Sequence, residues 1–211
     1  MEHQNTAKRI AQILLEKNCV IFRPSDPFIY ASGLKGPIYC DNRKILSHPQ
    51  ERNIILDEFS KLIVDKDLKF DYIAGLATAG IPMATMIAMT LNWPLAYIRS
   101  KPKSHGKGNQ VEGDVKENTT LLLVEDLVNQ ASSLEEAYNG LINEKLHEDS
   151  CLSIVDYEMP AAKDRLNKME LDLYSLTNLT NLIEVAREMN KISDEEVELI
   201  KGWHADPKSW S

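Results

Sequence analysis

Short apolar segments alternate with helix-like segments along most of this chain, and this alternation limits the folds it can adopt more than any other feature. The most apolar segment, residues 119–124, precedes a helical pattern over residues 134–145. The same order recurs after residues 71–75, 151–157 and 171–176. Apolar strands joined by helices are typical of parallel sheets that are buried on both faces. We therefore expect an α/β fold with a mainly parallel central sheet flanked by helices.

The chain is expected to form one domain over residues 1–211. It has no internal repeat, no low-complexity tract and no linker, and 211 residues suffice to bury a full hydrophobic core. Ser193 with Glu196 predicts a capped final helix, and Ser47 with Gln50 predicts a second helix of the same kind.

Composition and charge argue against several classes of protein. The formal net charge of -8 disfavours a nucleic-acid-binding protein, because phosphate backbones are bound by extended basic surfaces. No apolar run approaches the roughly 20 residues of a membrane-spanning helix, and the N-terminal segment has the pattern of an amphipathic helix rather than a signal peptide. The three cysteines show neither metal-binding nor redox spacing. We expect a cytoplasmic protein with no nucleic-acid and no membrane partner.

A cationic segment contrasts with this acidic background. Arg99, Lys101, Lys103, His105 and Lys107 place a potential cation at every second position. The glycines among and after them disfavour a helix or a packed strand. A mobile cationic loop is suited to closing over a small polyanion, whereas the alternative interpretation is a solvated basic loop with no ligand.

Two carboxylates follow the most apolar strand. Glu125 and Asp126 are costly to place at a buried strand end without a partner, and hydroxyl groups or a hydrated cation are suitable partners. Asn129, Ser132 and Ser133 then open a helix, where amides and hydroxyls can hold a phosphate. The alternative is a strand end with solvated acids and a serine N-cap.

Another turn, Gly75-Leu-Ala-Thr-Ala-Gly80, is built from small residues and precedes the helix expected from about Ile81. Small side chains let backbone amides approach an anion closely. Ligands gather at the carboxyl ends of parallel strands, so this turn, the acid pair and the cationic loop are expected to contribute to one site.

Together these motifs resemble the type I phosphoribosyltransferases, whose signature is an apolar strand, two acids and a phosphate-binding turn. Within that family the chain is similar to the orotate phosphoribosyltransferases over nearly its whole length. The similarity rests on four segments in the family's order, residues 28–43, 77–82, 97–106 and 112–113. The C-terminal part, residues 176–210, also resembles one bacterial branch.

The resemblance implies transfer of the phosphoribosyl group from phosphoribosyl pyrophosphate (PRPP) to orotate, giving orotidine 5′-monophosphate and pyrophosphate in pyrimidine biosynthesis. It implies Mg²⁺ as the cofactor, held chiefly by substrate oxygens with no direct protein ligand. It implies a homodimer in which the loop of one subunit closes over the site of the other. It also implies a small hood, mainly from residues 1–45 and C-terminal elements, and a flexible catalytic loop over residues 99–113.

By matched position, the resemblance assigns roles to individual residues. Catalysis is assigned to three loop cations and one acid, with Lys103 as the main cation on the leaving pyrophosphate: Arg99, Lys103, His105 and Asp126. PRPP is assigned the loop cations, the acid pair and both turns: Arg99, Lys101, Lys103, His105, Glu125, Asp126, Leu127, Val128, Asn129, Gln130, Ala131, Ser132, Ser133, Thr78 and Ala79. Orotate is assigned Lys35, Asn129 and Tyr157.

The chain departs from the family pattern in the turn after the acids. Residues 129–133 read Asn-Gln-Ala-Ser-Ser, whereas the family has a glycine at the position of Ala131. A left-handed backbone at Ala131 would cost roughly 1 kcal/mol. This change leaves an alternative function open, that of a catalytically weakened paralogue that binds PRPP or nucleotide as a sensor or partner subunit. Transfer to a different base is a third interpretation.

Overall fold

The computed structural model describes residues 2–30, 33–102 and 109–207. The chain forms two compact units, one of residues 49–176 and one of residues 1–48 with 177–211. Each unit is described by itself. The expectation of a single domain over residues 1–211 stays a prediction.

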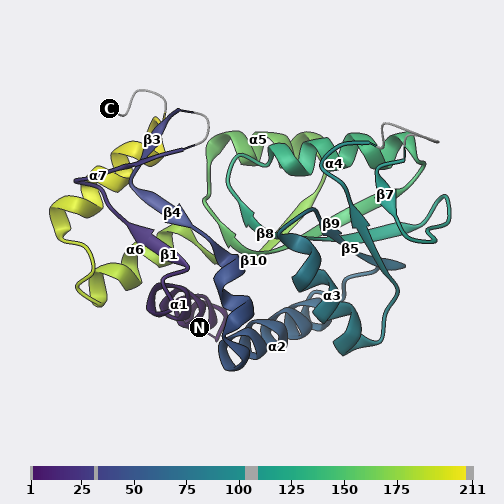
Figure 1. Cartoon of the computed structure of the whole chain (residues 1–211), viewed down its shortest axis with the longest axis horizontal. Coiled ribbons are helices and arrows are strands. Elements are labelled where there is room, and N and C mark those ends of the chain that lie inside the picture. Colours follow the sequence, from purple (N-terminus) through teal and green to yellow (C-terminus); the bar gives the residue numbers. More distant parts are fainter. Residues whose placement is uncertain (1, 31–32, 103–108, 208–211) are drawn as a thin grey trace. The chain divides into compact units, whose positions relative to one another are not determined.

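The larger unit is built on a sheet that has six strands within the described residues, in the order β10-β9-β8-β5-β6-β7 (Figure 1). Parallel pairing joins β9 to β8, β8 to β5 and β5 to β6, and β7 pairs antiparallel with β6. The strand bounds are Tyr72–Leu76 for β5, Leu95–Ile98 for β6, Val111–Glu112 for β7, Thr120–Val128 for β8, His147–Asp156 for β9 and Asp172–Asn178 for β10. The mainly parallel α/β sheet predicted from the sequence is confirmed.

Helices cover both faces of this sheet, also as predicted. In Figure 1, α4 (Ser132–Asn143) and α5 (Pro160–Met169) lie on one face, and α2 (Pro49–Asp65) and α3 (Gly80–Leu91) lie on the other. Helix α3 connects the neighbouring parallel strands β5 and β6, and α4 connects β8 and β9. Such a connection places the start of each helix at the carboxyl end of the strand before it.

Strand β8 forms the centre of the core. The side chains of Leu121–Val124 are no more than 1% exposed, because β5 and β9 flank β8 and helices cover both faces of the sheet. The sequence predicted a strand that ends at Val124, and the structure extends it to Val128. Pairing with β9 continues that far, with Glu125 opposite Ser153 and Val128 opposite Asp156. Both acids therefore lie within a strand rather than after it.

Gly80 brings the start of α3 directly against β8. A Cβ at this position would lie 2.1 Å from the backbone oxygen of Val124 and 3.3 Å from the Cα of Glu125. No side chain fits at such distances without moving one backbone away from the other. The small-residue turn before α3 is thereby held beside the first of the two acids.

The smaller unit combines helices with two small antiparallel sheets of two strands each. Its N-terminal part contains α1 (Glu2–Glu16), β1 (Val20–Phe22) paired with β4 (Ile38–Cys40), and β2 (Phe28–Ile29) paired with β3 (Lys35–Gly36). Helix α1 packs against α6 (Leu179–Glu188), where Lys8 forms an ion pair with Glu184. The last helix, α7 (Asp194–Ala205), begins with the predicted capping box of Ser193 and Glu196.

The second predicted capping box is wrong. Ser47 closes a short 3-10 helix, η1 (Asn42–Ser47), and α2 begins only at Pro49. Proline is favoured in the first turn of a helix because the backbone N–H it lacks would have no intrahelical partner there. Helix α2 therefore begins at Pro49, and Ser47 is not its N-cap.

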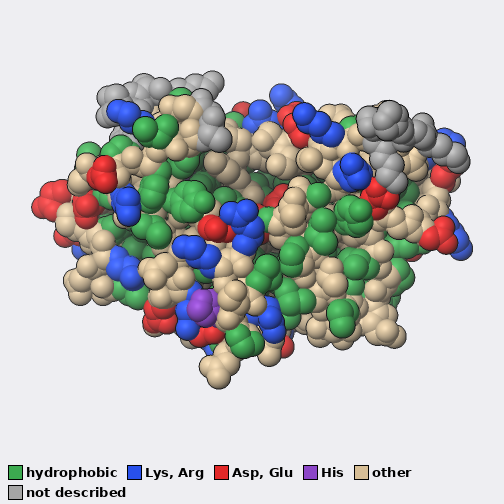
Figure 2. Space-filling model, in the orientation of Figure 1, with side chains coloured by type: hydrophobic (Ala, Val, Ile, Leu, Met, Phe, Trp, Pro, Cys, Tyr) green, Lys and Arg blue, Asp and Glu red, His purple; other side chains and the backbone are tan. Residues whose placement is uncertain are grey.

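The surface of the described residues is of mixed charge. On the face shown in Figure 2, basic and acidic side chains are interspersed with apolar ones. Within the described ranges, no helix is both long enough and apolar enough to cross a lipid bilayer.

Candidate active site

The predicted site motifs converge at one edge of the sheet of the larger unit. Strands β5, β6 and β8 are parallel, so the turn after β5, Arg99 after β6 and the acids of β8 lie at the same edge. The Ala77 N–H donates to the Ile98 oxygen at 2.8 Å, which ties this turn to the end of β6. The turn contains Thr78 and Ala79, and the peptide bond between Ala77 and Thr78 is cis.

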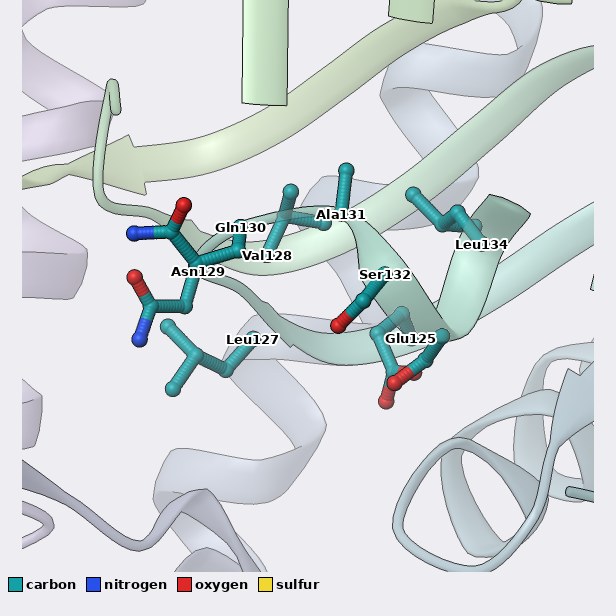
Figure 3. A pocket seen from close by; sticks show the side chains of 9 residues that line it. Glu125, Leu127, Val128, Asn129, Gln130, Ala131, Ser132 and Leu134 are labelled. Atoms are coloured by element: carbon teal, nitrogen blue, oxygen red, sulfur yellow. The ribbon is translucent and has the colours of Figure 1, made fainter. Parts of the chain in front are cut away.

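A pocket of about 80 Å³ lies where β8 passes into α4. Its walls come from one continuous piece of chain, as Figure 3 shows: Glu125, Leu127, Val128, Asn129, Gln130, Ala131, Ser132, Ser133 and Leu134. In that view the side chains of Ser132 and Glu125 point to the same side of the turn. The pocket is therefore bordered by a helix N-terminus and a carboxyl group.

Ala131 adopts a left-handed backbone conformation. Its φ is 56° and its ψ is 21°, which is left-handed, and it is the N-cap residue of α4. The strain that the sequence predicts for a left-handed Ala131 is therefore present. The alternative of a serine N-cap is wrong, because Ser132 is already the first helical residue. Since alanine has no polar side chain, Ala131 makes no capping hydrogen bond to the first turn.

Arg165 on α5 braces this turn from outside the pocket wall. Its guanidinium donates to the backbone oxygen of Gln130 at 2.7 Å and to the Glu135 carboxylate at 2.9 Å. The two contacts join α5 to the turn and to the first turn of α4. Arg165 is not predicted from the sequence, because a single arginine on a helix belongs to no motif and its partners are at least 30 positions away.

The acid pair has unusual electrostatics. Glu125 is half-buried, and its Oε1 accepts a hydrogen bond from the backbone N–H of Asp126 at 2.9 Å. Burial, with the negative charge of Asp126 as the next cause, raises the pKa of Glu125 to about 8. The pKa of the buried Cys151 thiol is also raised, first by burial and then by the charge of Glu125. At neutral pH, Glu125 is therefore mostly protonated, and a cation or a set of hydroxyl donors would favour its ionised form.

The site has no ready-made metal centre in the described part of the chain. No group of three or more histidine, cysteine, aspartate and glutamate side chains is arranged there to hold a metal ion. The adjacent carboxyl groups of Glu125 and Asp126 suit a Mg²⁺ ion that is held chiefly by substrate oxygens and water.

Asn129 carries an acceptor with no hydrogen-bond partner in the described structure. Its Oδ1 is buried beside the pocket. A buried carbonyl oxygen without a donor is costly, so this atom is suited to accept a hydrogen bond from a bound molecule. The backbone of Tyr157 lies next to that of Val128, because the Tyr157 N–H donates to the Val128 oxygen at 2.9 Å. The side chain of Tyr157 is buried.

Arg99 begins the cationic segment beside β7. Its N–H donates to the backbone oxygen of Gln110 at 2.9 Å, and its guanidinium lies 3.4 Å from the Glu112 carboxylate. Lys101 is exposed. Lys103 and His105 lie outside the described residues. Lys35 belongs to β3 of the smaller unit, where it is exposed.

Sequence comparison identifies relatives over nearly the full chain. Residues 42–193 match the family model of the phosphoribosyl transferase domain. The chain is 42% identical over 200 residues to the orotate phosphoribosyltransferase of Bacillus subtilis, covering 95% of this chain and 93% of that protein. It is 37% identical over 206 residues to the orotate phosphoribosyltransferase of Coxiella burnetii, covering 98% of this chain and 99% of that protein.

Solved structures share the fold. UMP synthase of Leishmania donovani matches with a TM-score of 0.79 at 29% identity, covering 94% of this chain and 42% of that one. Orotate phosphoribosyltransferase of Aeropyrum pernix matches with a TM-score of 0.71 at 23% identity, covering 86% of this chain and 99% of that one. The second likeness, at this identity, is one of fold alone.

Replacing Ala131 by glycine is expected to stabilise the protein. Glycine removes the left-handed strain at φ 56° but adds freedom to the unfolded chain, so the free energy of unfolding should rise by roughly 0.5–1 kcal/mol. Urea unfolding measures it, with Ala137→Gly as the control, because glycine in the interior of α4 should lower stability. Loss of stability in Ala131→Gly would show that the turn does not hold this conformation in solution.

Glu125 predicts a specific pH dependence of stability. Its pKa is about 8 in the folded protein, above its usual value of 4.5, so stability from this group is present below pH 4.5 and is lost as the pH rises to about 8. Glu125→Gln should nearly match the native protein at pH 4.5 and exceed it by roughly 4–5 kcal/mol at pH 8.5. Urea unfolding at several pH values tests this, with Glu136→Gln on the exposed face of α4 as the control. A difference that does not change with pH would contradict the assignment.

Proposed function

Because this chain belongs to the orotate phosphoribosyltransferases, within the phosphoribosyltransferase family, we propose that it joins the phosphoribosyl group of PRPP to orotate. The bond between the anomeric carbon of ribose and a pyrophosphate oxygen breaks, and its electron pair leaves with pyrophosphate. A ring nitrogen of orotate, which gives up its proton to solvent, forms the new bond to that carbon. The products are orotidine 5′-monophosphate and pyrophosphate, a step of pyrimidine biosynthesis.

One observation carries this proposal beyond sequence identity. The turn before α4, the acid pair of β8 and Arg99 after β6 occupy the same edge of the sheet. A phosphoribosyl pyrophosphate has a phosphate at one end, hydroxyls in the middle and a pyrophosphate at the other end. The turn and the acid pair offer a helix N-terminus and two carboxylates for the first two, and the guanidinium of Arg99 suits the pyrophosphate of the site that its segment serves.

The 5′-phosphate is assigned to the turn of residues 129–133. The N-terminal turn of α4 and the exposed Ser132 and Ser133 provide N–H and O–H donors for it. Ala131 keeps the backbone angle that a glycine would adopt, so the turn retains this conformation in spite of its sequence. For this reason we favour a working enzyme over a sensor or partner subunit.

Glu125 and Asp126 are assigned to the ribose hydroxyls. A carboxylate that accepts hydroxyl hydrogen bonds orients the sugar so that its anomeric carbon faces the incoming base. These two side chains would also hold Mg²⁺ through the sugar and bound water, since the described residues lack a metal-binding cluster. When bound, Mg²⁺ supplies positive charge that stabilises the pyrophosphate oxygens.

The leaving pyrophosphate is assigned to the cations of residues 99–113. Arg99 and Lys101 follow β6, so they extend from the site edge of the sheet. Lys103 and His105, which lie outside the described residues, complete the set by matched position. Positive charge at the leaving group lowers the barrier as negative charge develops there, and this reaction requires no protein nucleophile.

Orotate is assigned to Asn129, Tyr157 and Lys35. The buried Oδ1 of Asn129 has no partner in the described structure, so it can accept from a ring N–H of the base. A lysine such as Lys35 supplies a positive charge for the orotate carboxylate.

We further propose a homodimer that acts in the cytoplasm, with residues 99–113 of each subunit serving the partner's site. Apolar side chains are exposed at the end of α3 and along β6, immediately before Arg99: Met89 is 77% exposed, Trp93 45%, Leu95 40% and Tyr97 36%. An exposed apolar group of this size is typical of a surface that another protein covers.

The native protein should consume orotate only when PRPP and Mg²⁺ are both present, as measured by the loss of orotate ultraviolet absorbance. Asp126→Asn should lower kcat/KM on the order of 100-fold, because it weakens orientation of the sugar. Uracil offered in place of orotate serves as the specificity control. A folded protein that binds PRPP but consumes no orotate would contradict the proposed function.

Mixing two inactive variants tests the shared loop. Lys103→Ala and Asp126→Ala subunits carry their defects in different parts of the site, so a mixed dimer should contain one intact site. Random mixing in equal amounts should restore about a quarter of native activity, since about half of the dimers are mixed and each has one working site. Purified mixed dimers without activity would show that the loop serves its own subunit.

A further inference from the structure

Gln110 is a buried polar residue at the far end of the cationic segment. Its side chain and backbone together are only 5% exposed. Its backbone oxygen accepts the Arg99 N–H at 2.9 Å, and its side-chain Nε2 donates to the Arg99 oxygen at 2.8 Å. Both backbone polar groups of Arg99 are therefore bonded to the same residue. The Arg99 backbone cannot move without breaking its hydrogen bonds to Gln110.

Glu144 fastens Gln110 to helix α4. Its Oε1 accepts from the backbone N–H of Gln110 at 2.5 Å and from that of Val111 at 3.1 Å. Glu144 follows the last helical residue, where the negative end of the helix dipole disfavours a carboxylate. The two amide donors offset this unfavourable position, since hydrogen bonds to a charged acceptor are stronger than neutral ones.

Gly140 provides the space that this arrangement needs. A Cβ there would lie 2.4 Å from Oε1 and 2.8 Å from Cδ of Gln110, so the amide rests directly on the helix backbone. Gln110 Nε2 also points to the backbone oxygen of Glu136, at 3.4 Å. Glycine weakens a helix interior, and α4 carries it at the one turn that receives the Gln110 side chain.

Helix α4 thus links the phosphate pocket of its own subunit to the segment that carries Arg99. Its first turn borders the pocket assigned to the 5′-phosphate, and its last turn holds the segment that holds Arg99. A helix is a stiff element, so the distance between the phosphate turn and the Arg99 backbone is set by contacts at both ends of α4.

We propose that Gln110 and Glu144 are positioning residues of the phosphoribosyl transfer, acting through Arg99. They hold the Arg99 backbone in fixed relation to α4, so that in the proposed dimer its guanidinium is set to meet the pyrophosphate at the partner's site. This inference rests on the proposed function and adds two residues to the machinery that contact neither substrate nor reacting atoms.

A double-mutant cycle with Arg99 tests the proposal. Gln110→Met keeps the length and burial of the side chain but removes its donor, and should lower kcat/KM for PRPP about 10- to 100-fold. The KM for orotate should change less than about 2-fold. In an Arg99→Ala background, the same substitution should lower kcat/KM less than about 3-fold, because the residue through which it acts is already gone.

A second pair of variants covers the case in which Gln110→Met folds poorly. Glu144→Ala should lower kcat/KM for PRPP about 10-fold, and Glu144→Gln, which keeps an acceptor oxygen, should recover most of it. Glu136→Ala, which removes an exposed carboxylate from the same helix, should leave kcat/KM within about 2-fold of the native value. Calorimetric binding of pyrophosphate with Mg²⁺ should weaken in Glu144→Ala and in Gln110→Met, without any need for turnover.

Independent, multiplicative effects of Gln110→Met and Arg99→Ala would overturn the inference, as would losses of activity that simply follow losses of thermal stability. Such results with an active native protein would leave the proposed function intact. Absence of orotate turnover by the native protein would instead overturn the proposed function, and this inference with it.

Discussion

The parallel pairing of β8 with β5 and β9 is the constraint on which the rest of the larger unit depends. It buries Leu121–Val124 completely and continues beyond them, which carries Glu125 and Asp126 into a half-buried strand. It also sets the carboxyl ends of β5, β6 and β8 at one edge, where α3 and α4 begin. Gly80 completes this arrangement by letting α3 start in contact with the Val124 oxygen.

The fold followed from sequence patterns because its central strands have apolar segments and helices fill the intervals between them. The Ser193–Glu196 box of α7 was predicted correctly, since this signal acts within one helical turn. The length of β8 could not be predicted, because only its pairing with β9 extends the strand through two charged residues. Ser47 was misread as a cap because the 3-10 helix before α2 has no clear sequence signal.

The candidate site was predictable where its residues are close in sequence, and not where they are distant. The acids, the turn of residues 129–133 and the left-handed strain at Ala131 all lie in one continuous segment. Arg165, Gln110 and Glu144 act instead across about 30 positions or more, through contacts that exist only after the strands and helices pack. These contacts hold the turn without the family's glycine and tie Arg99 to α4, so this site relies on tertiary contacts as well as on its motif.

The central claim is that the edge formed by β5, β6 and β8 binds one phosphoribosyl pyrophosphate from end to end. A crystal structure of the protein with PRPP and Mg²⁺ tests it most directly. The account predicts the 5′-phosphate against the backbone N–H groups of residues 130–133, the ribose hydroxyls within hydrogen-bonding distance of Glu125 and Asp126, and the pyrophosphate facing Arg99 of the other subunit of the dimer. A sugar phosphate bound with its 5′-phosphate away from the start of α4, or with its ribose away from the two acids, would contradict it.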